Sequence, residues 1–318
     1  MSVVVAELVR SDFIEGRHHG SVLALEADGS TAYAAGDVDA PMLPRSCNKP
    51  IQAVSMVRAG LVLPERLLAL AAASHSGEDF HVAAVREILA GAGLDESALR
   101  TPEDYPLDDL ARDELVRAGG RRDRIHMNCS GKHAAMLATC VARGWPIEDY
   151  LAPAHPLQEA IAATFVELTG EPVAKATTDG CGAPLLGTTL RGLAGGFARI
   201  ATAMEGAEAL VAGAIRSFPE YVSGTRRDEC ALIRAVPGLI GKFGAEACYA
   251  VAFPDGRAVA LKIEDGGDRA RPVVMAALLR HLGWDTGEGI DTDAVRRTGA
   301  SRVLGGGRVL GELRAVLG

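Results

Sequence analysis

The segment RSCNKP, residues 45–50, contains a serine and a lysine three positions apart, Ser46 and Lys49. Three positions are close to one helical turn, so on a helix the two side chains would lie on the same face. A serine hydroxyl is a weak nucleophile until a base removes its proton. A neutral lysine can be that base when burial or a nearby cation, such as Arg45, lowers its pKa. The segment therefore indicates a serine activated by lysine; the alternative is a helix-capping serine followed by a surface lysine.

Lysine is rare in this chain, which makes the position of each one informative. Only five of the 33 basic residues are lysine, and the other 28 are arginine. Lys242 lies in GKFGAE, where the glycines allow a ligand to approach the backbone closely. It could serve a second serine or hold a substrate carboxylate. Ser74 opens SHSGE directly after a strongly apolar stretch. A polar loop in that place is typical of a cleft, although a plain helix end would look similar.

Two further loops place cysteines among polar residues. In NCSGKH, Cys129 precedes Lys132 and His133 at the expected start of a helix, where backbone N–H groups can bind a negative group. In TTDGCG, Asp179 lies two residues before Cys181. Two thiolates and a nitrogen are a suitable ligand set for zinc, but the same cysteines could be buried thiols. No pair of histidines has HExxH-type spacing.

Hairpin signals occur near both ends of the chain. Residues 21–37, SVLALEADGSTAYAAGD, form two alternating runs joined by Asp28-Gly29. A second hairpin is predicted from ACYAVAF and RAVALKIED, which turn at residues 254–256, PDG. The glycine-rich LGGGRVLG at 304–311 does not follow a strand in the manner of a phosphate-binding loop, so it predicts a turn before the last short element.

The segments between the hairpins have apolar residues three and four positions apart, which predicts helices. They are CNKPIQAVSMVRAGL, PERLLALAAAS, DFHVAAVREILAGAG, GKHAAMLATCVARG and HPLQEAIAATFVELTG, and PVVMAALLRHLG continues the pattern after the second hairpin. Strands at both ends with helices between them do not alternate as βαβ units do. The sequence therefore predicts an α+β fold in a single domain, 1–318. Its antiparallel sheet comes from about 1–45 and 240–318, and its helical body from about 46–239.

Composition excludes several classes of protein. With 48% hydrophobic and 23% charged residues, the chain is typical of a globular protein. Its net charge of −8 argues against a nucleic-acid partner, which would require a basic face. No secretory signal and no apolar stretch near the roughly 20 residues of a membrane helix are present, so we expect a soluble cytoplasmic protein without a membrane partner. Six cysteines in a chain of this size do not form a disulfide framework.

Taken together, these motifs resemble the L-asparaginase II family, the rhizobial-type class of L-asparaginases. The matching segments, in chain order, are HHGSVLALEADG, PRSCNKPIQ, ASHSGEDFH, NCSGKHAAML, HPLQ, TDGCGAP, GKFGAEACYA and KIEDG. They extend over roughly residues 5–270, and several are uncommon strings rich in glycine and cysteine. Residues 271–318 match the family least.

The resemblance implies a fold related to the serine β-lactamases and penicillin-binding proteins, hydrolysis of L-asparagine to L-aspartate and ammonia, and a homodimer. It makes Ser46 with Lys49 one serine–lysine tandem and Ser74 with Lys242 another. Ser46 is the expected nucleophile, because helix geometry fixes its lysine partner. The pairing of Ser74 with Lys242 depends instead on a tertiary contact.

The resemblance also implies a zinc site and a substrate pocket. Zinc would be bound by Cys129, Lys132 and Cys181. Lysine must lose its proton to bind a metal, so we expect weak binding that positions substrate more than it holds the fold together. The family's substrate-side positions fall on Arg45, His133 and Asp179. Asp179 would hold the ammonium group of the substrate and Arg45 a carboxylate, each by charge complementarity.

Two other functions compete with this one. The first is a glutaminase, a β-lactam-binding hydrolase or another serine–lysine amidohydrolase on the same fold. One extra methylene changes discrimination by only about 1 to 3 kcal/mol, which a linear sequence does not reveal. The second is a non-enzyme that binds an amino acid. Such a protein would normally have lost a nucleophile or a base, and here both tandems are present.

Overall fold

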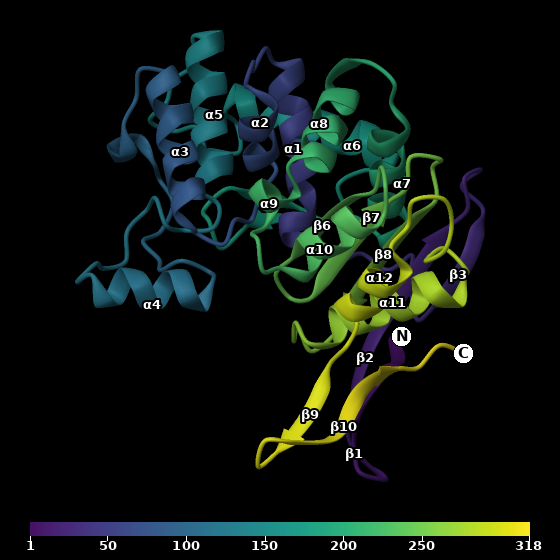
Figure 1. Cartoon of the computed structure of the whole chain (residues 1–318). Coiled ribbons are helices and arrows are strands. Elements are labelled where there is room, and N and C mark those ends of the chain that lie inside the picture. Colours follow the sequence, from purple (N-terminus) through teal and green to yellow (C-terminus); the bar gives the residue numbers. More distant parts are fainter.

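The computed structural model describes all 318 residues and contains one large antiparallel sheet (Figure 1). Its strands lie in the order β6-β7-β8-β2-β1-β10-β9, and β3 pairs with β2. The strands are β1 Val3–Arg10, β2 Phe13–Leu25, β3 Thr31–Ala35, β6 Ile240–Gly244, β7 Cys248–Ala252, β8 Ala258–Ile263, β9 Arg302–Gly305 and β10 Arg308–Ala315. The long strand β2 joins the two ends of the chain, because it pairs with both β1 and β8.

Both predicted hairpins are present. The first turns at Asp28-Gly29, where Gly29 has a φ of 84° and the Asp28 carboxylate accepts a hydrogen bond from the Ser30 N–H at 2.9 Å. Left-handed backbone of this kind favours glycine. The glycine-rich C-terminal segment is also a turn, at Gly306-Gly307, but it has a strand on each side and forms a further hairpin, β9–β10. Short, exposed strands with weak alternation concealed that hairpin in the sequence.

Helices fill the chain between β3 and β6. They are α1 Lys49–Arg58, α2 Glu65–Ala71, α3 Asp79–Gly91, α4 Asp109–Arg117, α5 Ser130–Arg143, α6 Pro156–Thr169, α7 Leu190–Thr202, α8 Gly206–Ser217, α9 Pro219–Val222 and α10 Asp228–Ala235. Two 3-10 helices, η1 Arg45–Asn48 and η2 Glu96–Ala98, and the small hairpin β4 Ala176–Thr178 with β5 Pro184–Leu186 interrupt them. Helices α11 Ala270–His281 and α12 Thr292–Thr298 follow the second hairpin. The predicted α+β fold, a sheet from both chain ends with a helical body, is confirmed.

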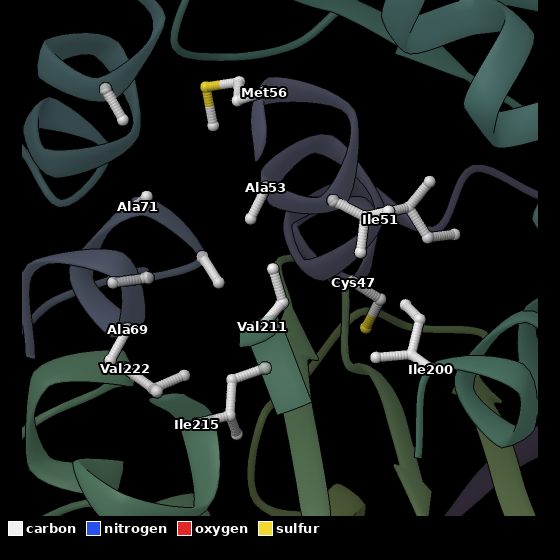
Figure 2. Packing of buried hydrophobic residues seen from close by; sticks show 14 of the residues in the cluster. Cys47, Ile51, Ala53, Met56, Ala69, Ala71, Ile200, Val211, Ile215 and Val222 are labelled. Carbon is white, nitrogen blue, oxygen red and sulfur yellow. The ribbon is translucent and has the colours of Figure 1, made fainter. Parts of the chain in front are cut away.

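The sheet is covered on both faces, and its strands show the alternation that this requires. In β2, Leu23 belongs to the core shared with the helical body, whereas Val22 and Ala24 belong to a second core against α10, α11 and α12. Figure 2 shows part of the larger core, where side chains from α1, α2, α7 and α8 converge, among them Ile51 and Val211. Burying an aliphatic side chain contributes about 1.5 to 3 kcal/mol. Helix α1 is therefore firmly held, and it carries Lys49 at its first turn.

Some parts of the chain extend beyond these two cores. Helix α4 lies apart from the other helices and has no buried residue (Figure 1). The outer parts of β1, β2, β9 and β10 form an arm that projects from the rest of the sheet. None of the helices has both the length and the apolar character needed to cross a membrane.

Candidate active site

Ser46 lies in a tight turn, η1, that runs directly into α1. The turn begins with Arg45 in the left-handed region, at a φ of 51°. Gly244 of β6 packs against the turn so closely that a Cβ there would lie 2.6 Å from the Pro44 carbonyl oxygen and 3.1 Å from the Ser46 nitrogen. The Cys47 thiol also donates to the Lys242 carbonyl oxygen at 3.0 Å. Strand β6 therefore fixes the position of the serine.

Replacing Gly244 with alanine should displace this turn. We expect kcat/KM to fall about 10- to 100-fold, since a misplacement near 1 Å has an effect of that size. The melting temperature should fall by several degrees, because overpacking is destabilising. Gly195→Ala in α7 is the matched control, since a Cβ there meets nothing within 4 Å. Kinetics and thermal unfolding of both variants make the comparison; equal activities would show that the turn tolerates displacement.

The Lys49 amine is buried, with a relative exposure of 1% for the residue, and donates three hydrogen bonds. Its acceptors are the Ala73 carbonyl oxygen at 2.5 Å, the Ser74 hydroxyl at 2.9 Å and the Cys129 sulfur at 3.1 Å. The structure thus differs from the predicted pairing, because Lys49 hydrogen-bonds Ser74 and not Ser46. Both residues do lie on one helical turn, but the long lysine side chain extends across to the loop after α2. The surface-lysine alternative is wrong.

Lys242 is also fully buried, and its amine has no hydrogen bond to Ser74. Its amine donates to the Phe243 carbonyl oxygen at 2.9 Å and lies 3.4 Å from the Glu229 carboxylate. Burial lowers the pKa of Lys242 to about 8 despite the opposing effect of Glu229. The predicted pairing of Ser74 with Lys242 is therefore replaced by Ser74 with Lys49 and Glu229 with Lys242. Sequence reasoning missed Glu229; the signal was an acid inside the apolar pattern of DECALIRA.

Two cysteines meet beside this lysine–serine group. Cys129 is the residue before α5, and Cys181 lies in the turn between β4 and β5. Both are buried, and the Lys132 amine donates to the Cys181 sulfur at 3.2 Å. The hydrogen bond from Cys129 lowers the pKa of Cys181, with Lys132 adding to the effect, and the same bond raises the pKa of Cys129. Negative charge in this pair is therefore favoured on Cys181 over Cys129.

The predicted substrate-side residues lie at the more open edge of the site. Arg45 donates to the Asp179 carboxylate at 2.8 Å and has Glu246 at 3.6 Å. The side chains of Arg45 and Asp179 are 23% and 11% exposed, and that of Glu246 is 60% exposed. His133 is different, because it is fully buried and shares a hydrogen bond of 2.7 Å with Tyr150. Burial lowers the pKa of His133.

These contacts join Lys49, Ser74, Cys129, Lys132 and Cys181 into one group, and Arg45 pairs separately with Asp179. Lys242 is linked to the serine turn through Cys47, and His133 follows Lys132 on α5. The model of the L-asparaginase II family matches residues 6–315. The chain belongs to the L-asparaginase II family. This is a family of hydrolases, so the chain is an enzyme of that class. No match was found among curated proteins.

Several solved structures are similar to this L-asparaginase II family chain at low identity. A beta-lactamase from Mycobacterium bovis has 15% identity and a TM-score of 0.39 over 83% of this chain and 94% of that one. EstCE1, a hydrolase with promiscuous acyltransferase activity, has 12% identity and a TM-score of 0.42 over 87% and 93%. Mglu has 15% identity and a TM-score of 0.38 over 85% of this chain and 62% of its own. The family match, not these partial similarities, assigns the chain.

The three residues that the family resemblance implies as zinc ligands are Cys129, Lys132 and Cys181. No group of three histidine, cysteine or acidic side chains converges in the structure. The donors that do come together are the two sulfurs and the Lys132 amine, all buried and in hydrogen-bond contact. Two thiolates and a nitrogen fit zinc chemically, with a fourth position open. The residues of this family member therefore fit the metal.

Proposed function

We propose that this hydrolase converts L-asparagine to L-aspartate and ammonia, with Ser46 as the nucleophile. The observation that carries the proposal is the Lys49 amine, which is buried one turn after Ser46 and bonded to the Ser74 hydroxyl. A buried amine that holds a serine hydroxyl has the arrangement needed to move protons during acyl transfer. Ser46 is the more exposed of the two serines, at 9% against 3%, and it adjoins Arg45. These features support attack by Ser46 and a proton-relay role for Ser74.

The reaction can be written in two steps. The Ser46 oxygen forms a bond to the side-chain amide carbon of the substrate, and its proton passes by way of the Ser74 hydroxyl to the Lys49 amine. The carbon–nitrogen bond then breaks, and ammonia leaves with the proton that Lys49 returns. Water repeats the sequence on the resulting ester, which releases L-aspartate and restores the serine. Backbone N–H donors that stabilise the oxyanion contribute about 3 to 4 kcal/mol each in comparable enzymes.

Substrate recognition would use the charges at the edge of the site. An α-amino acid presents one ammonium group and one carboxylate. Asp179 would accept the ammonium group, and Arg45 would bind the carboxylate. In the structure these two side chains neutralise one another at 2.8 Å. A zwitterionic substrate can replace that pair without leaving either charge unpartnered, which favours a free amino acid over an uncharged amide.

We propose zinc as a cofactor held by Cys129, Cys181 and Lys132. A bound zinc would supply a positive charge for orienting substrate. It should not be needed for folding, because Cys129 and Cys181 belong to a small cluster of 4 buried residues outside the two large cores. We expect a chelator-treated sample to keep its melting temperature within a few degrees while KM for asparagine rises. Differential scanning fluorimetry and steady-state kinetics measure both, with Lys132→Met as the variant that loses the metal. Unfolding of the chelated protein at room temperature would contradict this.

We also propose that the protein is a homodimer, as the family resemblance implies. The projecting arm carries Phe13, Leu304 and Val309, which are 71%, 57% and 57% exposed. Exposed apolar side chains gathered on one element are typical of an interface. We expect sedimentation equilibrium to give twice the chain mass, and Phe13→Glu to give a monomer. A monomer at micromolar concentration for the unaltered chain would contradict the proposal.

The experiment that tests the function is ammonia release by the purified protein, with and without added zinc. L-asparagine, L-glutamine and a β-lactam should be compared side by side. We expect the highest kcat/KM for asparagine. A preference for glutamine would assign the same chemistry to a glutaminase. Tight binding of asparagine without ammonia release would instead indicate an amino-acid-binding protein.

A further inference from the structure

Glu229 and Lys242 form an ion pair in which neither side chain has any solvent exposure. In the other ion pairs of the chain at least one side chain is partly exposed; even for Arg271 and Asp228 the values are 3% and 21%. Removing two charges from water costs free energy that their attraction often fails to recover. A pair of this kind is therefore poorly explained by stability alone. Its position beside the serine turn suggests a role in the reaction.

The carboxylate of Glu229 is fixed to the backbone of β6. Its Oε1 atom accepts a hydrogen bond from the Phe243 N–H at 3.0 Å and lies 3.4 Å from the Lys242 amine. The same amine donates to the Phe243 carbonyl oxygen at 2.9 Å and lies over the Phe243 ring, 4.2 Å from its centroid. Glu229 and the peptide groups of Phe243 thus hold the lysine amine from several sides, and it cannot turn freely.

Strand β6 connects this pair to the nucleophile. The Cys47 thiol, next to Ser46, donates to the carbonyl oxygen of Lys242 at 3.0 Å. The Lys49 amine is close enough to lower the pKa of Lys242 by charge repulsion. A proton on Lys242 places a positive charge close to Lys49 and to the serine turn. The charge near Lys242 therefore affects whether an amine in the site can accept the serine proton.

We propose that Glu229 is a positioning residue of this enzyme, which anchors the Lys242 amine and supplies the negative charge that sets the pH at which Lys242 releases its proton. The inference deepens the proposed function and rests on it, since it assumes that a neutral amine accepts the proton of the attacking serine. Glu229 does not touch the serines in the structure. It acts through Lys242.

The other charged or ionisable groups around this pair come from several elements. They are Cys47 from η1, Lys49 from α1, Cys248 and Tyr249 from β7, Asp228 from α10, Arg227 just before α10, and Arg271 from α11. Glu229 is the only carboxylate within hydrogen-bond distance of the Lys242 amine. Removing its charge should therefore let Lys242 release its proton at a lower pH. An opposite charge within about 4 to 6 Å typically shifts a pKa by about 1 to 3 units.

The presence of only five lysines makes a direct measurement practical. We would label lysine side chains with carbon-13 at Cε and follow the five signals by NMR from pH 6 to 11. Lys242→Met assigns the Lys242 signal, and the exposed Lys175 serves as an internal reference. In Glu229→Gln the Lys242 midpoint should fall by about 1 to 3 units. In Glu229→Asp, which keeps the charge, it should fall by less. Glu87→Gln, in an exposed ion pair with Arg66, is the matched control and should change nothing.

The pH dependence of kcat/KM for asparagine is then measured on the same samples. The acid limb of Glu229→Gln should move down by the same amount as the Lys242 signal. A Lys242 midpoint within about 0.3 units of the unaltered protein would overturn the anchoring role. A shifted signal with an unshifted acid limb would overturn the role in the reaction. If the unaltered protein releases no ammonia, the proposed function fails. A fall in the NMR midpoint of Lys242 would still support anchoring by Glu229 in that case. The two failures are therefore distinguishable.

Discussion

Replacing Ser46 with alanine is expected to lower kcat for asparagine at least about 1,000-fold, with little change in stability. Loss of a serine nucleophile removes the covalent route, and only binding and oxyanion stabilisation remain. The substitution removes a single oxygen atom from a residue that is 9% exposed. We therefore expect no large cavity in the core. Steady-state ammonia release and a thermal melt measure the two quantities.

Replacing Ser74 distinguishes a proton-relay role of that serine from a role as nucleophile. Ser74→Ala removes the hydroxyl that accepts from Lys49 at 2.9 Å, and we expect kcat to fall about 100-fold, within the range for loss of a proton-transfer group. An electrophilic asparagine analogue should still modify position 46 in that variant, as read by peptide mass spectrometry. Ser217→Ala, on the exposed end of α8, is the matched control and should keep full activity. Labelling of Ser74 alone in the unaltered protein would show that the nucleophile has been misassigned.

Activity is expected to rise steeply with pH up to about 8. Burial lowers the pKa of Lys242 to about 8, well below its ordinary value, and Lys49 adds to this lowering. Below that pH the buried Lys242 amine is mostly protonated, and a protonated amine cannot accept a proton during the reaction. At pH 7 only about one tenth of the Lys242 amines are neutral, and at pH 5 about one in a thousand. The logarithm of kcat/KM should therefore increase with a slope near one from pH 5 to 8 and then level off.

The measurement is a pH profile of kcat/KM at constant ionic strength. A control at each pH checks that the protein is still folded. Lys242→Met removes the buried amine. The rise of kcat/KM with pH that levels off near pH 8 should then be absent from the activity that remains. Lys175→Met, at an exposed position, should leave the profile unchanged. A flat profile between pH 6 and 9 in the unaltered protein would exclude a lysine with a pKa near 8 from the rate-limiting chemistry.

Most of the architecture could be predicted from the sequence, because its signals are local. Alternating runs around Asp28-Gly29 and Asp255-Gly256 gave the strands β2, β3, β7 and β8, and helical periodicity gave α1, α2, α3, α5, α6 and α11. Helices α4, α7, α8, α9, α10 and α12 were not predicted. In α7 the run LRGLAGGF carries glycines that weaken the helical signal, and packing against the sheet stabilises it instead. In α4 no residue is buried, so there is little apolar pattern to detect.

For the site, the sequence predicted which residues take part but not which hydrogen-bond partner each of them has. The rarity of lysine marked Lys49, Lys132 and Lys242, and a serine three residues before Lys49 marked Ser46. Spacing of three residues placed Ser46 and Lys49 on one turn, as the structure has them. Which hydroxyl Lys49 bonds depends on where the loop after α2 lies, and that loop is positioned by a hydrogen bond from the Ser74 N–H to the Val222 carbonyl oxygen at 3.0 Å. Glu229 entered the site for the same reason, through the packing of α10 on β6.

The sequence alone determined the sheet at the two chain ends, the helical body, the family and the set of groups that do chemistry, because each of these depends on short stretches of chain. Tertiary structure decided the pairs: Lys49 with Ser74, Lys242 with Glu229, Arg45 with Asp179 and Cys129 with Cys181. A long, flexible amine can reach several partners, and only the packing of distant elements selects among them. That selection sets the hydrogen-bond partners of each lysine amine, and with them the chemistry that the serines can perform.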